Sequence, residues 1–472
     1  MSSVFEWINK IILDYFFVFS FLIGGAYFTI KMGFIQIRYF PKMLRILLNG
    51  STPEGVDNSE QTGLSSLQAF LISTASRVGT GNLIGVSMAI TIGGIGAAFW
   101  MWVMAFLGMA TALVESSLAQ LYKKPDGNGF FVGGPSYYMR MGLNSPLLSK
   151  LFMIAILLVV FIMGSMMQIN AVALEMYDAF SVPKWLVGII VSLFILFTMM
   201  GGLKRIADIS TIAVPLMTIS YMMLAGYLMI KYANMLPLVF QSIFREAFNV
   251  QSTVAGGLGT VIAMGVRRGL MSNEAGMGTA AAAAAVASTS HPVKQGLIQS
   301  FSVFLDTFLI CTATVMIIVL APGVDAATLG DTSLLSYALQ FHLGSWAGIS
   351  LSFMILVLAV TTMTGYLYYG ESSVRFFSQS KKSLRIYQIV FLLTVFAGAV
   401  LDPSITWQLV DYSLAFAALT NLYAIWRLFP QVQSLVKDFE EQYTKEGNAS
   451  LDLGVDHYEK HNFTTPLAGW EN

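Results

Sequence analysis

The chain has 472 residues, of which 56% are hydrophobic and 11% are charged, whereas an ordinary soluble domain has about 25% charged residues. This composition excludes a soluble multidomain enzyme and indicates a polytopic membrane protein. Its 26 basic and 26 acidic residues cancel, which gives no reason to expect a nucleic-acid partner. The single cysteine, Cys311, excludes a disulfide framework, a Cys-rich zinc site and an iron–sulfur cluster.

Eleven apolar segments are long enough for a membrane-spanning helix, which needs about 20 apolar residues. The first is too long for the core of a cleaved signal peptide, so we expect a retained helix. The predicted fold is therefore all-α, with about 11 transmembrane helices. The expected spans are roughly 11–32, 66–92, 95–121, 150–174, 184–202, 208–231, 255–288, 294–320, 345–374, 384–401 and 404–428.

Lys and Arg residues are distributed unevenly between the two sets of loops. The loops after odd-numbered spans hold 15 of them and the C-terminal tail holds four more, against four in the opposite loops. Because cytoplasmic loops are enriched in Lys and Arg, we expect the N-terminus outside and the C-terminus in the cytoplasm. The remaining three, Arg77, Arg267 and Arg268, lie inside apolar spans, where charge usually marks a functional region.

Two spans carry glycine-rich sequences near their middle. The first reads Ala75-Ser-Arg-Val-Gly-Thr-Gly-Asn82, and the second reads Arg268-Gly-Leu-Met-Ser-Asn-Glu-Ala-Gly-Met-Gly278. Glycine in a helix interior costs about 1 kcal/mol relative to alanine, and Asn and Ser compete for backbone hydrogen bonds. Both stretches are therefore predicted to unwind. Unwound backbone at membrane depth lines a cavity or is buried in protein.

Each break opens a set of five spans, and because five is odd the second set must be inverted relative to the first. Matching breaks in two inverted halves indicate the midplane site of a secondary transporter. The bland alternative is helix packing through small residues. The predicted organisation is 1–65 (an extra helix and loop), 66–232 (first repeat), 255–429 (second repeat) and 430–472 (a polar cytoplasmic tail).

Several motifs resemble those of the alanine/glycine:cation symporter family. They are Val78-Gly-Thr-Gly-Asn82, Gly93-Gly-Ile-Gly-Ala-Ala-Phe-Trp-Met-Trp102, Gly133-Gly-Pro-Ser-Tyr-Tyr138, Ser272-Asn-Glu-Ala-Gly276 and Tyr368-Tyr-Gly-Glu371. The resemblance implies a leucine-transporter-type fold with an extra N-terminal helix. It also implies sodium-driven import of small neutral amino acids (alanine, glycine, serine or D-alanine) across the cell membrane. One departure is Tyr366, where the family commonly has tryptophan, and this bears on the width of the side-chain pocket.

The breaks suggest how an amino acid would bind. Free N–H groups after the first break can hold a carboxylate, and carbonyls at the end of the first half of the second broken helix can accept from an ammonium. Gln168 is favoured over Asn170 as a pocket residue, because residues two apart do not share a helix face. The predicted substrate-binding residues are Gly79, Thr80, Gly81, Asn82, Gln168, Ser272, Asn273, Gly276, Thr362 and Tyr366.

The co-transported sodium ion is placed by analogy with the leucine-transporter-type fold. Carbonyls of Ala75, Val78 and Leu358 and hydroxyls of Thr361 and Thr362 are its predicted ligands. The alternative for these hydroxyls is bonding to carbonyls of their own helix.

The alternative function is a proton-coupled amino-acid permease of the same fold, which needs a titratable group in the path, and Glu274 and Asp306 are the candidates. As structural roles, we expect Glu274 to satisfy freed N–H groups or to pair with Arg268. Asp306 is expected to neutralise Arg267 or Arg268.

Two other function classes fit poorly. A membrane enzyme would carry a motif such as His-Glu-x-x-His, a P-loop or Gly-x-Ser-x-Gly, and the sequence has none of them. A channel would predict a continuous polar stripe or a charged ring, and neither is present. The expected partners are therefore a small neutral amino acid and the lipid bilayer, with no catalytic residues.

Overall fold

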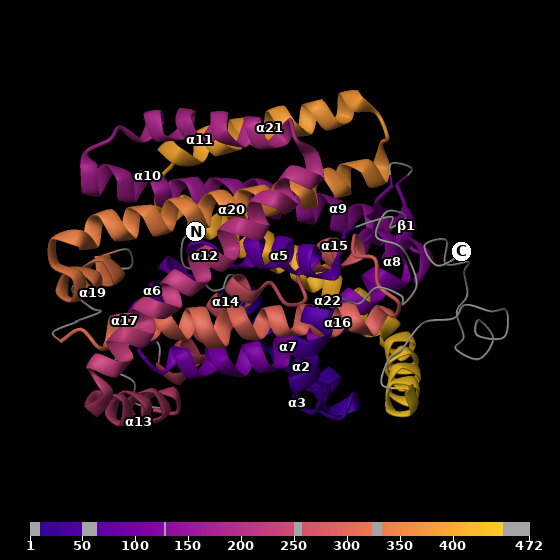
Figure 1. The fold of residues 1–472 in the computed structure, drawn as a ribbon, viewed down its shortest axis with the longest axis horizontal. Helices are drawn as coiled ribbons and strands as arrows, with labels where there is room; N and C mark the ends of the chain where they lie inside the picture. The colour runs from indigo at the N-terminus through magenta and orange to yellow at the C-terminus, as the bar shows by residue number, and fades with distance from the viewer. Residues whose placement is uncertain (1–9, 50–63, 127–128, 250–256, 323–332, 447–472) are drawn as a thin grey trace.

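Residues 10–49, 64–126, 129–249, 257–322 and 333–446 are described by a computed structural model of the chain. These residues are mostly helical (Figure 1). Strands β1 (Lys124–Pro125) and β2 (Phe131–Val132) pair antiparallel, with Lys124 opposite Val132. By length and composition, eight helices within these ranges can cross a membrane. They span Ile11–Lys31, Ala97–Leu121, Pro146–Phe180, Lys204–Lys231, Pro292–Val319, Leu334–Phe377, Lys381–Val400 and Pro403–Tyr443.

The helical elements of the first half include π-helical (η1, η3) and 3₁₀ (η2, η4) turns. In order they are η1 (Lys10–Phe17), α2 (Val18–Lys31), α3 (Ile35–Arg38), α4 (Phe40–Asn49), α5 (Ser66–Arg77), η2 (Thr80–Asn82), α6 (Ile84–Gly93), α7 (Ala97–Leu121), α8 (Pro135–Met141), α9 (Pro146–Phe161), η3 (Ile162–Met166), α10 (Met167–Phe180), α11 (Lys184–Met199), α12 (Gly202–Lys231), η4 (Ala233–Met235) and α13 (Leu236–Ala247).

The second half has one π-helical element (η5) and one 3₁₀ turn (η6). In order it comprises α14 (Gly257–Asn273), α15 (Thr279–Ala285), α16 (Pro292–Val303), η5 (Phe304–Cys311), α17 (Thr312–Val319), α19 (Ser333–Leu343), η6 (Gly344–Trp346), α20 (Ala347–Phe377), α21 (Lys381–Val400) and α22 (Pro403–Glu446).

Local sequence explains where several helices begin. Ser65 and Gln68 form a capping box at the start of α5, in which each side chain accepts a hydrogen bond from the other residue's backbone N–H. Helices α8, α9 and α16 have proline in their first turn, where its missing N–H is not needed. Both predicted breaks are present: the turn at Gly79–Asn82 separates α5 from α6, and residues 274–278 separate α14 from α15.

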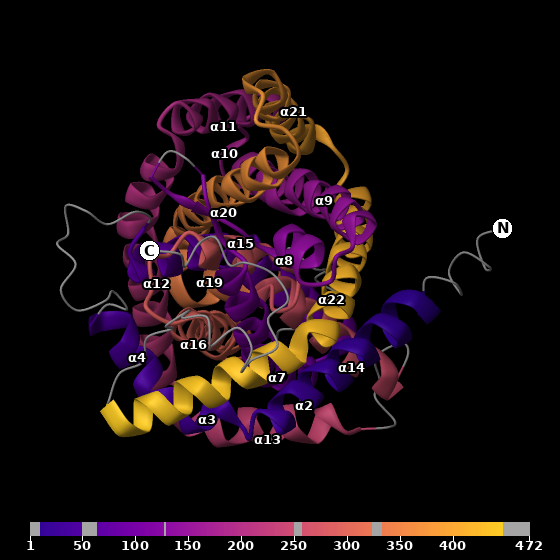
Figure 2. The same ribbon diagram turned by 90° about the vertical axis from the view of Figure 1, so that its right-hand side faces the viewer.

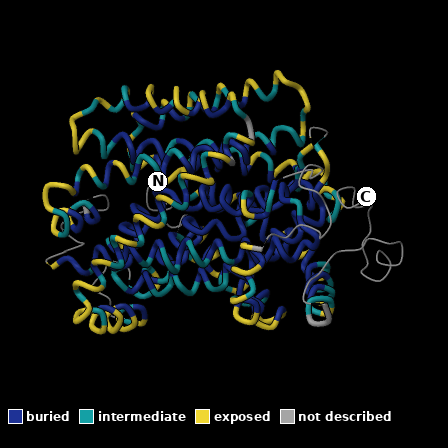
Figure 3. The backbone as a smooth tube through the Cα atoms, viewed as in Figure 1, coloured by how far each residue is buried: buried dark blue, intermediate teal, exposed yellow. Residues whose placement is uncertain are grey.

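The helices form a layered bundle with the broken helices inside it. Helices α11 and α21 pair at one edge, α9, α10 and α20 follow, and α5, α14, α16 and α7 lie deeper (Figure 1). The buried backbone is concentrated around these inner helices, whereas the outer helices are exposed on one side (Figure 3). Their outward residues are apolar, as with Ile190, Leu216 and Leu393, which are 57%, 64% and 62% exposed. Such a surface suits lipid rather than water.

Helix α22 has 44 residues and continues well past residue 430, where the sequence predicts a solvated tail. Its last part crosses the end of the bundle (Figure 2). An apolar stripe of Val432, Leu435, Val436 and Phe439, spaced as one helix face, is buried there and explains the difference. Arg38 and Glu440 form an ion pair of 2.8 Å beside it. Residues 447–472 lie outside the described residues.

Candidate functional site

The first break is a buried turn closed by its own asparagine. The Val78 amide is the last to bond back into α5, donating to the Thr74 carbonyl at 2.8 Å. Asn82 then closes the turn with two hydrogen bonds. Its side-chain Oδ1 accepts from the backbone amide of Gly79 at 2.8 Å, and its backbone amide donates to the Gly79 carbonyl at 3.1 Å. The turn is therefore preformed, with its backbone groups gathered in the interior of the bundle.

A neutral side chain occupies the amide side of this break. Gln168 on α10 accepts hydrogen bonds at its Oε1 from the Thr80 amide (3.2 Å) and from the Thr80 hydroxyl (3.0 Å). In the described part of the chain, the Gly81 amide makes no hydrogen bond. A Cβ at Gly81 would meet the methyl carbon of Met271 at 3.2 Å, so Met271 covers this face. The Thr80 donors are therefore held by a neutral acceptor, which an ionised acceptor can displace.

Hydroxyl and carbonyl oxygens also gather beside the first break, next to Gln168. Thr362 on α20 donates its hydroxyl to the carbonyls of Ala75 (3.1 Å) and Val78 (3.3 Å). A Cβ at Gly79 would lie 2.6 Å from the Thr362 Oγ1, so glycine is required for this close approach. The neighbouring Thr361 donates to the Leu358 carbonyl of its own helix at 3.0 Å. Of the two threonines, Thr362 is the one whose hydroxyl reaches across to α5.

The second break has a different backbone. Glu274, Gly276 and Gly278 have φ angles of 55°, 84° and 83°, in the left-handed region that favours glycine. A Cβ at Gly278 would lie 2.4 Å from the ring of Pro135, and one at Gly276 would lie 2.8 Å from the ring of Phe21. Close packing and backbone conformation therefore both require glycine at these two positions.

Carboxylates satisfy this second break. Glu115 on α7 accepts from the Gly276 amide at 3.1 Å and from the Gly278 amide at 2.9 Å. The Glu274 carboxylate accepts from the Thr279 hydroxyl at 2.7 Å and from the Tyr366 hydroxyl. Glu274 therefore bonds within its own break and to α20, and its predicted pairing with Arg268 is not observed.

Asp306 joins the two breaks. Its carboxylate accepts from the Asn82 side-chain amide at 2.6 Å, from the Ser272 hydroxyl at 2.8 Å and from the Thr307 hydroxyl at 2.9 Å. The thiol of Cys311 lies beside the same groups, 3.1 Å from the Ser272 hydroxyl and 3.4 Å from the Asn82 amide nitrogen. This cluster connects α14 and the first break to the π-helical turn η5.

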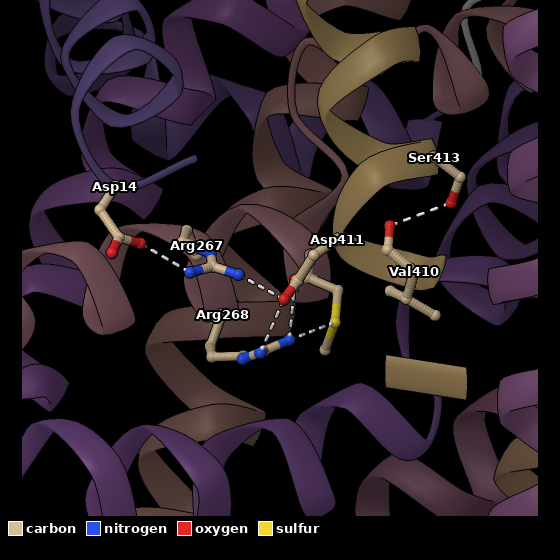
Figure 4. A network of polar contacts seen from close by, with 7 residues as sticks. Asp14, Arg267, Arg268, Val410, Asp411 and Ser413 are labelled. Carbon is tan, nitrogen blue, oxygen red and sulfur yellow. Dashed lines mark hydrogen bonds and ion pairs between the residues drawn. The ribbon is translucent and has the colours of Figure 1, made fainter. Parts of the chain in front are cut away.

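The arginines inside the second broken helix have other partners than the sequence predicts. Arg267 pairs with Asp14 at 2.7 Å and with Asp411, and Arg268 pairs with Asp411 at 3.2 Å (Figure 4). The prediction that Asp306 neutralises these arginines is therefore wrong. Their side chains lie toward α22 and the first helix, whereas Asp306 faces the first break.

Cavities approach the breaks from opposite ends of the bundle. One of about 500 Å³ lies among α6, α10, α19 and α20, and reaches Ile84, two residues after the first break. Another of about 350 Å³ lies at the opposite end, lined by Arg140, Arg375 and Phe376 among others. Between it and the second break, the rings of Tyr137 and Phe376 meet edge to face with centroids 4.6 Å apart.

Most of the predicted site residues do meet in space. Gly79, Thr80, Gln168 and Thr362 form one contact set, and Asn82 touches Ser272 at 2.9 Å. Asn170 contacts a neighbouring helix instead, and its side-chain amide donates to the backbone carbonyls of Gly398 on α21 and of Leu401 just after it. Others take partners away from this set: Gly276 bonds Glu115, Asn273 bonds Thr307, and Tyr366 bonds Glu274.

Two residues that contact the breaks were not predicted from the sequence. Met271, which covers Gly81 and Gly85, gives no signal because apolar residues are common in every span. Asn421 on α22 donates to Glu115 and to the Gly276 carbonyl, both at 2.9 Å. Asn421 is an amide side chain inside an apolar span, which is the same sequence feature that identified Gln168 as a candidate.

Known amino-acid carriers are similar to this chain over nearly its whole length. The profile of the sodium:alanine symporter family matches residues 1–452. The amino-acid carrier protein AlsT of Bacillus subtilis is 42% identical over 94% of each chain. The probable sodium/glutamine symporter GlnT of the same organism is 40% identical over 91% of this chain and 87% of its own. The sodium/alanine symporter AgcS of Methanococcus maripaludis is 32% identical over 93% of this chain and 97% of its own.

Solved structures show the same fold at low identity. A crystal structure of a mutant Eremococcus coleocola manganese transporter has a TM-score of 0.54 and 14% identity, covering 89% of this chain and 88% of that one. The family profile and the relatives indicate a multi-pass membrane transporter and not an enzyme. The chain belongs to the sodium:alanine symporter family.

Proposed function

We propose that the protein is a sodium-coupled symporter that imports small neutral amino acids by alternating access. Alanine and glycine are the first candidate substrates, followed by serine and D-alanine. The family supports sodium and an amino acid as the transported pair. Its relatives carry names that include both alanine and glutamine, so the choice of substrate must come from the pocket itself.

The observation that carries the proposal is the first break, where amide donors lie next to a group of neutral oxygens. The substrate carboxylate binds the Thr80 and Gly81 amides, where it replaces the amide oxygen of Gln168. Met271, which covers this face, forms one wall of the pocket. Tyr366 limits the side chain from α20, and its ring is fully buried against Gly164.

Sodium binds beside the same break. The Thr362 hydroxyl oxygen already lies 3.1 Å from the Ala75 carbonyl oxygen and 3.3 Å from the Val78 carbonyl oxygen. Leu358 and Thr361 supply a further carbonyl and hydroxyl from α20. Such uncharged hard oxygens suit a monovalent cation that must also leave the site. Because the sodium ion and the substrate would both bind groups of the first break, the binding of one would favour the binding of the other.

The remaining organisation follows from the same proposal. Residues 66–232 and 255–429 form two inverted five-helix repeats, each opened by one break, within an eleven-helix chain. The N-terminus lies outside, so the cavity at Ile84 faces the exterior and the cavity at Arg140 faces the cytoplasm. Alternating access then consists of exchanging which of the two cavities communicates with the breaks.

Uptake of labelled alanine into proteoliposomes tests this function. A sodium gradient without a pH gradient should drive saturable uptake, and glycine, serine and D-alanine should compete more strongly than leucine. Because one relative is named a putative sodium/proton-dependent alanine carrier, a second arm applies a pH gradient alone. Full uptake in that arm would show that protons, and not sodium ions, drive transport. Non-saturable flux would instead contradict a carrier.

A further inference from the structure

The second break holds a buried carboxylate. The Glu115 side chain is fully buried, and both of its carboxylate oxygens bind backbone amides of the break, at Gly276 and Gly278. A third donor, the side-chain amide of Asn421, lies 2.9 Å from the same carboxylate. Three N–H donors therefore surround one negative charge with no water between them.

This cradle is fixed by its neighbours. The Asn421 amide also donates to the Gly276 carbonyl at 2.9 Å, and its oxygen accepts from the hydroxyl of Tyr138 on α8. The two glycines cannot be replaced without collisions, so the amides keep their direction. Helices α7, α8 and α22 thus hold the donors of the second break in one arrangement.

The first break offers similar amides to a weaker acceptor. There the acceptor is the neutral oxygen of Gln168, at 3.2 Å from the Thr80 amide. Hydrogen bonds to an ionised acceptor are roughly twice as strong as those to a neutral one. A substrate carboxylate therefore displaces Gln168 from Thr80, but gains nothing by displacing the Glu115 carboxylate from the second break.

We propose that Glu115 is a positioning residue that gives the binding site its direction. By filling the amide donors of the second break with the protein's own carboxylate, it leaves the first break as the place where a substrate carboxylate binds. The ammonium end then points toward the carbonyl end of α14 and the Asp306 cluster. This inference rests on the proposed import of amino acids, and it adds the residue that fixes the orientation of the substrate.

Replacement of Glu115 by alanine tests the buried carboxylate. Glu115→Ala removes one CH₂ and the carboxylate, a fragment that acetate matches in size and charge, and leaves three donors unpaired. We expect a lower melting temperature in detergent and a loss of alanine uptake of about tenfold or more. Acetate should restore much of both losses, whereas acetamide, its neutral isostere, should not. Acetate at equal concentration on both sides of the liposome avoids a pH gradient.

A matched control is Glu371→Ala. Glu371 lies on α20 and accepts from the side-chain amide of Gln388 at 2.9 Å rather than from a broken backbone. Acetate should not stabilise this variant or the unmodified protein. Equal stabilisation of Glu371→Ala, or no difference between acetate and acetamide with Glu115→Ala, would overturn the proposal.

The reciprocal change tests the direction of binding. Gln168→Glu places a fixed carboxylate at the first break in nearly the same volume. Alanine should then no longer raise the melting temperature, and uptake should fall to background while the protein stays folded. Unchanged alanine binding in Gln168→Glu would also overturn the assignment. The acetate arm in detergent needs no transport, so it reports on Glu115 even if the unmodified protein fails to carry alanine.

Discussion

The two helix breaks look alike in sequence but differ in how their backbone groups are satisfied. The first is closed by Asn82 and contacted by Gln168 and Thr362, all uncharged, at 2.8–3.3 Å. The second is held by Glu115 and Glu274 and by glycines with positive φ. Neutral partners exchange readily with a ligand, whereas buried carboxylates do not. Under the proposed function, this difference assigns substrate binding to the first break and its support to the second.

The largest effect is expected from the glycines of the second break. Gly278→Ala forces a left-handed alanine, which costs about 1–2 kcal/mol, and adds a collision with Pro135 worth about 1–3 kcal/mol more. This is a large part of a typical folding free energy of about 5–15 kcal/mol. We expect little folded protein by size-exclusion chromatography. Gly259→Ala on α14, where a Cβ meets nothing within 4 Å, should behave like the unmodified protein.

The next effect separates the two threonines beside the first break. Thr362→Ala removes the hydroxyl that reaches Ala75 and Val78, so the sodium concentration for half-maximal uptake should rise about tenfold or more. Thr361→Ala removes a hydroxyl bonded within its own helix and should raise it only a few-fold. Sodium titrations of alanine uptake compare them. Wild-type sodium dependence in the double variant would remove this site altogether.

A smaller effect concerns the side chain that joins the second break to α20. Tyr366→Ala should let larger neutral amino acids compete, with methionine gaining about tenfold in apparent affinity, because the ring no longer fills the space beside Gly164. Tyr366→Phe keeps the ring but loses the bond to Glu274, so selectivity should stay and thermal stability should fall. Competition by leucine and methionine measures the first outcome. Identical selectivity in both variants would exclude Tyr366 as a pocket wall.

The last effect lies outside the binding site and is a pH dependence of stability at Lys123, just beyond the ends of α7 and α15. Lys123 lies beyond the end of α7 and donates to the Ala287 carbonyl at 3.1 Å. Burial lowers its pKa from 10.5 to about 7. The unfolded chain therefore binds more protons between pH 7 and 10.5, so stability should rise with pH there, by at most about 1.4 kcal/mol per unit. Below pH 7 both states are protonated and this contribution is flat.

The check is the melting temperature at pH 7 and pH 9. Lys123→Met should be more stable than the unmodified protein at pH 7 and should show a weaker rise toward pH 9. Lys124→Met, at the exposed neighbouring position, serves as the control and should leave the pH profile unchanged. A Lys123→Met protein with the original pH profile would show that this ammonium is not the group that titrates.

Local chemistry explains why both breaks were predictable from sequence. Glycine, Asn and Ser at Gly79–Asn82 and Ser272–Gly278 disfavour helix wherever they occur in a span, and the structure interrupts both helices there. The π-helical turns at 162–166 and 304–311 carry no comparable signal, because an extra residue in a helical turn depends on packing. The helical spacing of apolar residues at 432–439 could have predicted that α22 continues past residue 430.

Charge partners were the least predictable part of the site. Arg267, Arg268 and Asp306 lie in neighbouring spans, which made their pairing the simple expectation. Pairing instead depends on which side of each helix faces which neighbour, and α22 brings Asp411 to the arginines from 143 residues further along the chain. Glu115 and Asn421 meet across an even longer separation. Sequence periodicity gives a residue's position on its helix but not the helix that faces it.

The chain's single cysteine gives the experimenter a built-in chemical reporter. Cys311 is buried next to Asn82 and Ser272, where the two breaks come closest. No other cysteine has to be removed by mutation first, because any thiol label on the chain must be on this residue. The labelling rate with a membrane-impermeant maleimide, applied from one side and then the other, therefore measures how often each entrance admits a small molecule. Protection of the thiol by a bound amino acid becomes a binding assay that needs neither radioactivity nor flux.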